Sequence, residues 1–428
     1  MNPASSDLAL RRLRRHPLAA VCCALALATA VPAGAAVLPV SSCDDAGPGS
    51  LREVALSAGP GDTIDLSALT CSTITLSSGE IALSGDVTLK GPGADALAID
   101  AGLASRVLAH GGGLLTVADL SLINGKYSTA GDAAGGCIMS TGSVMLDHAV
   151  VTGCNVIAGE GGSARGGGLA VDGELSLLWS TISGNTALAD GTVEGGGARA
   201  GSLQTFYSQI RGNEATSTYA VSSAGGASIV GSTVVLSSAI TANRASEAAG
   251  LSAGSAAEDS VVILNSTISG NEAALRTGGA RIGGPLMLVS STIAFNLDAE
   301  AAGALHLTAG ADIQSTILAG NGDNDLGGAA DAAVSGANNL IGQATLMVPP
   351  DTLQTDPLLL PLADNGGYTP THALAAGSPA IDAGSNTASL IGDQRGAAFA
   401  REAGAAADIG AFEVQVGGDV LFRDGFDP

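Results

Sequence analysis

The sequence has few aromatic residues and few lysines. Phe, Tyr and Trp make up 3% of its 428 residues, and two lysines occur, Lys90 and Lys126. Because aromatic side chains bury the most area per residue, a globular core of this length would normally use more of them. Hydrophobic residues still make up 46% of the chain, and 62 residues are glycine. A core of Val, Ile, Leu and Ala with abundant glycine suggests many thin stacked layers.

Positive charge and long apolar runs are also scarce. The formal net charge is -23 at pH 7. So acidic a surface repels phosphate backbones and anionic lipid heads, so we expect no nucleic-acid partner. The apolar stretch Leu18 to Val31 is about 14 residues long, whereas a membrane-spanning helix needs ~20. We therefore expect no transmembrane span in the mature chain.

Residues 1–36 have the pattern of an export signal. Four arginines precede the apolar stretch, and small residues follow it up to Ala36. Removing this segment would leave 13 basic and 39 acidic residues, a charge of -26. A lipoprotein signal at Cys22 or Cys23 is disfavoured by Val21, and a twin-arginine signal is less favoured than an ordinary secretory one. We expect an exported protein, located extracellularly or on a bacterial cell surface.

Four cysteines lie beyond the signal: Cys43, Cys71, Cys137 and Cys154. An even number in an oxidising compartment suggests disulfides, for which three connectivities exist. Nearness in sequence favours Cys43–Cys71 and Cys137–Cys154. A metal site is the alternative, but C-x-x-C spacing and neighbouring histidines are lacking.

One phrase recurs along the middle of the chain. STISGN stands at 180–185 and 266–271, with near-copies at 208–213, 238–243, 291–296 and 315–321. Its closing asparagines are Asn185, Asn213, Asn243, Asn271, Asn296 and Asn321. Their successive spacings are 28, 30, 28, 25 and 25 residues, which indicates a solenoid. With three short strands per period and no helix, we predict an all-β, right-handed parallel β-helix.

Stacked coils place equivalent residues in ladders. We expect the apolar residue of the phrase to feed the core and the asparagines to form a structural ladder at a turn. There each Asn would take left-handed backbone angles and hydrogen-bond the Asn above and below. Asn124 and Asn155 would extend this register upstream. Longer turns at 187–194 and 214–223 would lie on one face.

These patterns divide the chain into five parts. The signal is 1–36 and an N-terminal cap is 37–62, where Ser50 and Glu53 form a capping box for a short helix. The parallel β-helix covers 63–345, and a segment closing the solenoid covers 346–415. A separate tail, 416–428, ends the chain.

Several motifs resemble known exported proteins. DPLLLPLADNGGYTPTHAL, GSPAIDAG, DQRG and DIGAFE, all within 356–413, resemble the choice-of-anchor Q group of bacterial exported proteins. The repeats resemble the right-handed parallel β-helix superfamily of pectate-lyase-like folds. GSLREV with GDTIDL resembles the cap of polymorphic surface proteins, a common version of which has Cys where this chain has Gly49. FRDGF, near the end, is similar to short sorting tails. The resemblance implies an exported or surface-displayed β-helix and carries no agreed enzymatic activity.

Candidate chemical residues are scattered. Glu214, Glu247 and Glu272 follow the Asn turns and could supply the paired carboxyls of a hydrolase, although solvated turns explain them better. Candidate cations for a lyase are Arg199, Arg244, Arg276 and Arg281. Asp323, Asn324 and Asp325 offer oxygen ligands for calcium, the best cofactor candidate, although a metal-free turn is favoured. Candidate carbohydrate platforms are Trp179, Tyr207 and Tyr219, and His372 is expected to make a structural hydrogen bond.

The leading hypothesis is an exported, non-catalytic surface, adhesion or matrix protein that needs no cofactor. Its partner would be an extracellular polysaccharide or a cell-surface protein. The alternative is a secreted carbohydrate-active enzyme, a lyase or hydrolase. That alternative requires a groove with two carboxyls, or with an arginine and carboxyls, clustered across adjacent coils.

Overall fold

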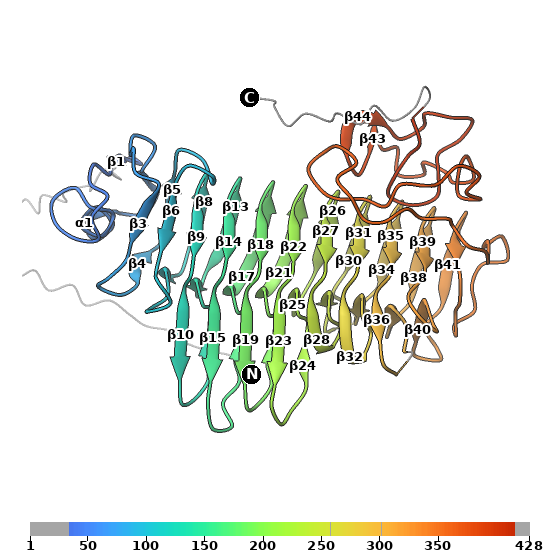
Figure 1. Cartoon of the computed structure of the whole chain (residues 1–428), viewed down its shortest axis with the longest axis horizontal. Helices are drawn as coiled ribbons and strands as arrows, with labels where there is room; N and C mark the ends of the chain where they lie inside the picture. The colour runs from blue at the N-terminus through green and yellow to red at the C-terminus, as the bar shows by residue number, and fades with distance from the viewer. Residues whose placement is uncertain (1–33, 257, 301, 416–428) are drawn as a thin grey trace, which may run out of the picture. The chain divides into compact units, whose positions relative to one another are not determined.

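The computed structural model describes residues 34–256, 258–300 and 302–415, so the expected signal up to residue 33 and the tail 416–428 lie outside the described residues. From Ala35 on, the described chain forms one compact unit. Its strands stack as an all-parallel β-solenoid, as predicted (Figure 1). No helix among these residues is long and apolar enough to cross a membrane.

One face of the solenoid, the short-strand face, is a sheet of eleven strands, one from each coil. The strands are β3 (Thr73–Thr75), β6 (Ala98–Asp100), β9 (Ser121–Ile123), β14 (Val150–Thr152), β18 (Thr181–Ser183), β22 (Gln209–Arg211), β27 (Ala239–Thr241), β31 (Thr267–Ser269), β35 (Thr292–Ala294), β39 (Ile317–Ala319) and β42 (Leu340–Ile341). Each pairs in parallel with the next, so the middle residues form one apolar column, such as Ile182, Ile210 and Ile240. All three are buried in the main core, where each contributes about 1.5–3 kcal/mol.

A second, twenty-stranded sheet contains two parallel columns. The first column is β4 (Ile81–Ser84), β7 (Leu108–Gly111), β12 (Ile138–Ser140), β17 (Leu169–Leu178), β21 (Ala198–Phe206), β25 (Ala227–Ile229), β29 (Leu251–Ala253), β33 (Ala280–Ile282), β37 (Leu305–Leu307) and β40 (Leu326–Gly328). The second is β1 (Val37–Pro39), β2 (Asp62–Asp65), β5 (Val87–Lys90), β8 (Leu114–Ala118), β13 (Ser143–Asp147), β26 (Thr233–Leu236), β30 (Val261–Leu264), β34 (Leu286–Val289), β38 (Ala311–Gln314) and β41 (Val334–Ala337). Strands β17 and β21 run through both columns.

The third sheet forms a projection from the middle coils, which we call the fin. Its outer strands are β10 (Lys126–Thr129), β15 (Asn155–Ala158), β19 (Thr186–Ala189), β23 (Glu214–Ser217), β28 (Arg244–Glu247), β32 (Glu272–Arg276) and β36 (Leu297–Asp298). Its return strands are β11 (Ala133–Ala134), β16 (Ala164–Arg165), β20 (Val193–Glu194) and β24 (Ser222–Ser223). Figure 1 shows these strands extending below the stack. The stretches expected as long turns, 187–194 and 214–223, are therefore largely paired strands.

The fin has a small core of its own. Alanines and valines such as Val156, Ala187 and Val193 pack between its outer and return strands, separate from the main core. Between the two cores, glycines allow backbone segments to come closer together than a side chain would permit. A Cβ on Gly196 would lie 2.4 Å from the Glu214 backbone, and one on Gly225 would lie 2.2 Å from the Arg244 carbonyl oxygen. The glycine clusters therefore permit a close backbone approach as well as left-handed turns.

Two left-handed bends flank each short strand from β9 to β39. In the coil of β18 they fall at Trp179 (φ 46°) and Gly184 (φ 61°). Equivalent bends precede the other ladder asparagines, at Gly212, Ala242, Gly270, Phe295 and Gly320. The expectation that each Asn itself takes left-handed angles was wrong, because the residue before it makes the turn.

The N-terminal end carries the cap. Helix α1 (Leu51–Ser57) begins after Ser50, whose side chain accepts a hydrogen bond from the Glu53 N–H, and the Glu53 carboxylate accepts one from the Gly49 N–H. Leu51 is fully buried against the first coils. A disulfide joins Cys43 to Cys71 beside this helix, and a second joins Cys137 to Cys154. These are the pairs that nearness in sequence favoured.

The C-terminal segment lies against the short-strand face of the later coils (Figure 1). Thr267 of β31 donates to Gln394 at 2.6 Å, and Ser269 is 2.8 Å from His372 Nε2. Two short antiparallel strands, β43 (Gly392–Asp393) and β44 (Gly396–Ala400), belong to this segment. At the end of the solenoid, Leu353 pairs with Leu340 of the last coil in an isolated parallel β-bridge.

Candidate functional site

The six predicted asparagines form a continuous buried ladder. The Asn243 side chain donates to the Ile210 carbonyl at 3.0 Å and to Asn271 Oδ1 at 2.9 Å. Its own Oδ1 accepts from the Asn213 backbone N–H and Nδ2, both at 3.0 Å. The same pattern repeats from Asn185 to Asn321, and all six are at most 2% exposed. Each amide thus satisfies its own hydrogen-bonding groups and those of its neighbours.

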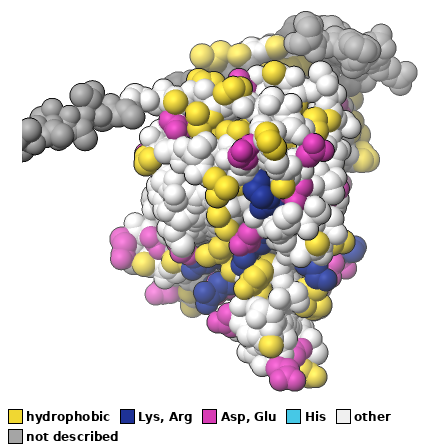
Figure 2. Space-filling model, turned by 90° about the vertical axis from the view of Figure 1, so that its left-hand side faces the viewer, with side chains coloured by type: hydrophobic (Ala, Val, Ile, Leu, Met, Phe, Trp, Pro, Cys, Tyr) yellow, Lys and Arg dark blue, Asp and Glu magenta, His cyan; other side chains and the backbone are white. Residues whose placement is uncertain are grey.

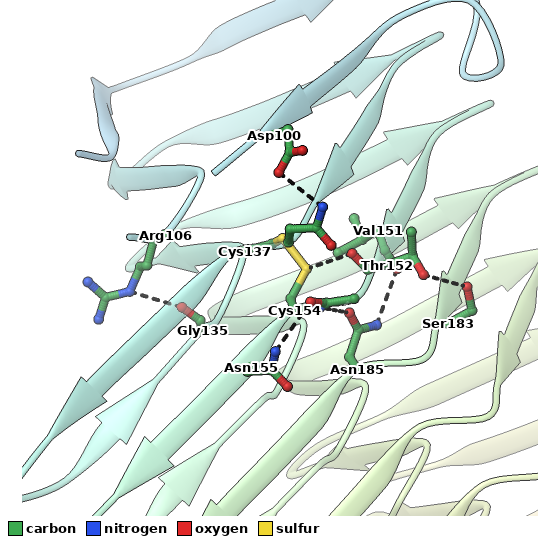
Figure 3. The surroundings of a disulfide bond; sticks show 12 residues. Asp100, Arg106, Gly135, Cys137, Val151, Thr152, Cys154, Asn155, Ser183 and Asn185 are labelled. Atoms are coloured by element: carbon green, nitrogen blue, oxygen red, sulfur yellow. Dashed lines mark hydrogen bonds between the residues drawn. A yellow bond between two sulfur atoms is a disulfide. The ribbon is translucent and has the colours of Figure 1, made fainter. Parts of the chain in front are cut away.

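Other residues end the ladder. At the N-terminal end Cys154 takes the next Asn position and donates its backbone N–H to Asn185 at 2.9 Å (Figure 3). Cys137 is level with Gly168 of the following coil. Within that coil Gly168 lies next to the Asn185 side chain. The disulfide therefore replaces a glycine–asparagine contact.

The upstream extension of the ladder was wrong. Thr152 pairs with Ile123 and Ser183, so Asn124 is level with Gly153, and Asn155 begins β15. Neither asparagine occupies the ladder position.

A second ladder was missed by the sequence analysis. The backbone N–H of Ser180 donates to Ser208 Oγ at 3.0 Å, that of Ser208 to Ser238 Oγ at 3.1 Å, and the series continues to Thr316. Its members from Ser180 to Ser291 are the first residues of their copies of the phrase, and Thr316 is the second residue of the copy at 315–321. They lie at the opposite end of the short strand from the Asn. The recurring first Ser was the available signal.

The calcium candidates lie at the far end of the Asn ladder. Asp325 Oδ1 accepts from the Asn321 backbone N–H and Nδ2, at 3.1 and 2.8 Å, and Oδ2 accepts from the Gln343 N–H at 2.8 Å. Asp323 is exposed, whereas Asn324 and Asp325 are buried. N–H groups occupy the lone pairs that a cation would need, so the geometry favours a hydrogen-bonding role for Asp325.

The charged residues of the C-terminal motifs point inward. Asp393 and Arg395 form a fully buried ion pair at 2.7 Å, and the Arg395 guanidinium lies between Phe399 and Phe412. Glu413 accepts the backbone N–H groups of Ala403 and Asp408. These motif residues therefore hold the segment together rather than face a substrate.

Burial shifts the pKa values of several charged residues in this C-terminal cluster. Burial raises the pKa of the Asp408 carboxyl, and it raises the pKa of Glu413 to about 7. Arg401 is also buried and donates to the Asp408 carbonyl, while its Nε and Nη1 have no hydrogen-bond partner among the described residues. His372 Nδ1 donates to the Leu360 carbonyl and Nε2 hydrogen-bonds Ser269 Oγ, the structural role that was expected, and burial lowers the pKa of the imidazole.

The candidate aromatic platforms are partly stacked on one another. Trp179 stacks against His148 at 5.1 Å and against Tyr207 at 6.2 Å between ring centroids. Tyr368 of the C-terminal segment lies 5.2 Å from Tyr207. Neighbouring rings cover the faces that would contact a sugar, so a structural stack explains them better. Tyr219, 85% exposed, stands alone at the fin tip.

The predicted arginines and glutamates gather on the two sides of the fin. On the outer side, Glu214, Arg244 and Glu272 occupy the same register on adjacent strands, and Arg244 pairs with Glu272 at 3.1 Å. They line a cavity of ≈350 Å³. Glu247 differs from the other two glutamates, because it lies at the opposite end of β28, on the other side.

The other side of the fin forms a groove with the first column of the twenty-stranded sheet. Arg165, Glu194, Glu247 and Arg276 lie on the fin, and Arg199, Arg281 and His306 face outward from β21, β33 and β37. Arg199 lies 3.7 Å from Glu194 and 3.8 Å from Asp172, while Arg276 pairs with Glu247 at 2.5 Å. In Figure 2, basic side chains gather with acidic ones where the lower projection joins the rest.

These groove pairs are exposed enough to exchange partners. Exposed ion pairs contribute about 0–1 kcal/mol each, so a polar ligand could replace them at little cost. A linear ligand lying along the axis would meet a new coil every ~4.8 Å. The groove thus meets the requirement of arginines with carboxyls clustered across adjacent coils.

Comparisons with known proteins add little. No protein-family model matches the chain, and no curated protein matches it. The crystal structure of the pectate lyase Pel9A is similar at 14% identity, with a TM-score of 0.40, over 89% of this chain and 97% of that one. Because the identity and the TM-score are this low, we assign the fold from the strand pairings of this chain and not from its similarity to Pel9A.

Proposed function

We propose that this protein is an exported, non-catalytic β-solenoid of the cell surface or extracellular matrix that holds an extended polysaccharide in the groove beside the fin. The observation that carries the proposal is the groove itself, in which Arg, Glu and Ser side chains recur on consecutive coils. Such a repeat matches a ligand that also repeats along its length. Guanidinium, carboxylate and hydroxyl groups all hydrogen-bond to sugar hydroxyls.

The arrangement of carboxyls favours binding without catalysis. A glycosidase acid must be a protonated carboxyl at the reacting bond, with its pKa raised by its surroundings. The groove carboxylates Glu194 and Glu247 instead face arginines on an open surface. The carboxyls whose pKa burial raises, Asp393, Asp408 and Glu413, are enclosed in the C-terminal segment.

Two observations support export. Disulfides persist in oxidising compartments, and two are present here. The motifs within 356–413 resemble the choice-of-anchor Q group, whose members are exported. The fold is compatible with both display and secretion.

The test is a panel of polysaccharides immobilised on beads. We expect retention of the protein on at least one polymer, no release of oligosaccharides, and loss of retention in the double variant Glu247→Ala with Arg276→Ala. Arg211→Ala, an exposed arginine on the short-strand face, is the matched control. Oligosaccharide release would overturn the non-catalytic part, and retention on none of the polymers would overturn the binding part.

A carbohydrate-active enzyme is the second candidate, favoured by one observation. Arg281 has no pairing partner among the described residues, and it lies in register beside His306. A cation next to an imidazole could serve proton abstraction. In that case the polymer panel would yield products that disappear in Arg281→Ala and in His306→Gln alike.

A further inference from the structure

Arg281 belongs to two neighbouring cavities in the groove. The larger, of ≈320 Å³, is lined by serines such as Ser228 and Ser252, by Glu194, and by small and apolar residues. The smaller, of ≈160 Å³, is lined by Glu247, Arg276, Thr277, Arg281 and His306. The Arg281 side chain therefore borders both spaces.

The two cavities differ in what they can hold. Pockets for whole small molecules measure about 300–1,000 Å³, so the larger one suits a sugar ring and the smaller one suits a single substituent. Serine hydroxyls donate and accept, as sugar hydroxyls require. A ring in the larger cavity would thus direct one substituent past Arg281 into the smaller.

The smaller cavity has an excess of hydrogen-bond donors. Arg276 pairs with Glu247 at 2.5 Å and lies 3.5 Å from Glu300, so carboxylates already balance its charge. Arg281 has no partner among the described side chains, and the enclosed Nδ1 of His306 has none either. Among the described residues, the smaller cavity therefore offers an unpaired guanidinium and an unused imidazole nitrogen.

The donors reach the smaller cavity from different elements. Arg281 comes from β33, His306 from β37, and Thr277 follows β32. Arg281 and His306 lie side by side in the twenty-stranded sheet, and Thr277 follows a strand of the fin. Donors from these two sheets match an acceptor with oxygens in several directions better than the two coplanar oxygens of a carboxylate, which a single guanidinium fork satisfies.

We infer that the groove recognises a glycan carrying a tetrahedral oxyanion ester, sulfate or phosphate, with the sugar ring in the larger cavity and the ester oxygens held by Arg281, His306 and Thr277. This inference rests on the proposed function and names the ligand class for the same groove. It requires no chemical step.

The experiment compares one polysaccharide in four forms: neutral, carboxylated, sulfated and phosphorylated. Retention of the full chain is measured at equal ionic strength. We expect the sulfated or phosphorylated form to bind about tenfold more tightly than the neutral and carboxylated forms, since a charge-assisted hydrogen bond is worth about this factor. The two ester arms identify which oxyanion is the ligand.

Arg281→Ala should remove this preference, so that the ester, carboxylated and neutral forms are retained equally. His306→Gln, which keeps a donor, should retain part of it, and Arg244→Ala, on the outer side of the fin, should retain all of it. Titration with inorganic sulfate and inorganic phosphate should shift the His306 imidazole resonances in the unaltered protein and not in Arg281→Ala. Equal retention of all four forms, or a preference that survives Arg281→Ala, would overturn the inference while leaving the proposed function intact. Retention of none would overturn the proposed function.

Discussion

At the scale of single residues, the amide side chains of the Asn ladder hydrogen-bond to backbone groups at a buried turn, as water does at an exposed turn. Each takes part in side-chain hydrogen bonds to two neighbouring coils while almost fully buried. A buried polar group that lost its partners would cost about 1–3 kcal/mol. The ladder therefore ties adjacent coils together and fixes their register.

Asn243→Ala tests this. It removes the acceptor for two Asn213 donors and the donor to the Ile210 carbonyl, so we expect a loss of about 3 kcal/mol in the free energy of unfolding. Denaturant unfolding measures it. Asn155→Ala is the control, because Asn155 makes a single long side-chain hydrogen bond of 3.4 Å. Equal unfolding midpoints for the two variants would contradict the role of the ladder.

Glu413 gives a pH dependence with a definite sign. Its pKa is raised from 4.5 to about 7 by burial, so the folded state binds the proton more tightly than the unfolded state. The resulting stabilisation is fully present below pH 4.5 and is lost as the pH rises through about 7.

We therefore expect the unfolding midpoint to fall between about pH 5 and about pH 8, and to fall less in Glu413→Gln, which cannot titrate. Thermal unfolding across this range measures the slopes. Glu402→Gln, an exposed neighbour, should keep the slope of the unaltered protein. A steeper slope in Glu413→Gln would refute the assignment.

At the scale of elements, β10 and β11 form one edge of the fin sheet, and among the described residues no further strand pairs with them. Unpaired edges invite pairing with other chains, and proteins commonly block them with charged side chains. Arg106 lies at this edge. It donates to the Gly135 carbonyl at 2.9 Å (Figure 3). It also donates to the Ala134 carbonyl at 3.0 and 3.1 Å, and its guanidinium covers the Tyr127 ring.

Arg106→Ala should expose these carbonyls and the small core behind them. We expect self-association that increases with protein concentration, detected by sedimentation velocity, while the far-ultraviolet circular dichroism stays unchanged. Arg211→Ala removes an exposed arginine from a sheet face and should leave the protein as it was. If both variants sediment identically, Arg106 does not protect the edge.

At the scale of the whole molecule, the C-terminal segment and the solenoid meet along the short-strand face. Gly410 lies at this contact with φ 107°, and a Cβ there would lie 2.8 Å from Ile317 Cδ1 and 2.9 Å from Thr292 Oγ1. The backbone N–H groups of Gly410 and Ala411 both donate to the solenoid. We infer that the C-terminal segment can pack against the short-strand face only if residue 410 has no side chain.

Gly410→Ala should weaken docking. We expect faster proteolysis within 346–415 while the coils remain resistant, as mapped by mass spectrometry of limited digests. Gly377→Ala is matched, because Gly377 has a φ of 85° and nothing within 4 Å of its added Cβ. Similar digestion of the two variants would show that backbone strain, not the contact, is responsible.

The sequence by itself determined the solenoid. A phrase that recurs at 25 to 30 residues can place its Ile in one column and its Asn in another only if the coils stack. The phrase also contained the Ser ladder, which was overlooked because a small polar residue before a strand has many uses. The αL turn beside each Asn was misplaced by one residue, because Gly, Ala and Phe all occupy it.

Tertiary structure alone decided the fin, the groove and the direction of the C-terminal charges. The fin strands are two to five residues long and rich in small side chains, so their pairing depends on neighbouring coils rather than on local propensity. Glu247 and Arg281 meet one groove only because β28 crosses from the outer side of the fin to the return side. Asp393 and Arg395 could have faced solvent by sequence alone, but two aromatic rings and a carboxylate enclose the guanidinium. The repeat determines which residues stack on one another. Which face of the solenoid is exposed depends on where the fin and the C-terminal segment pack.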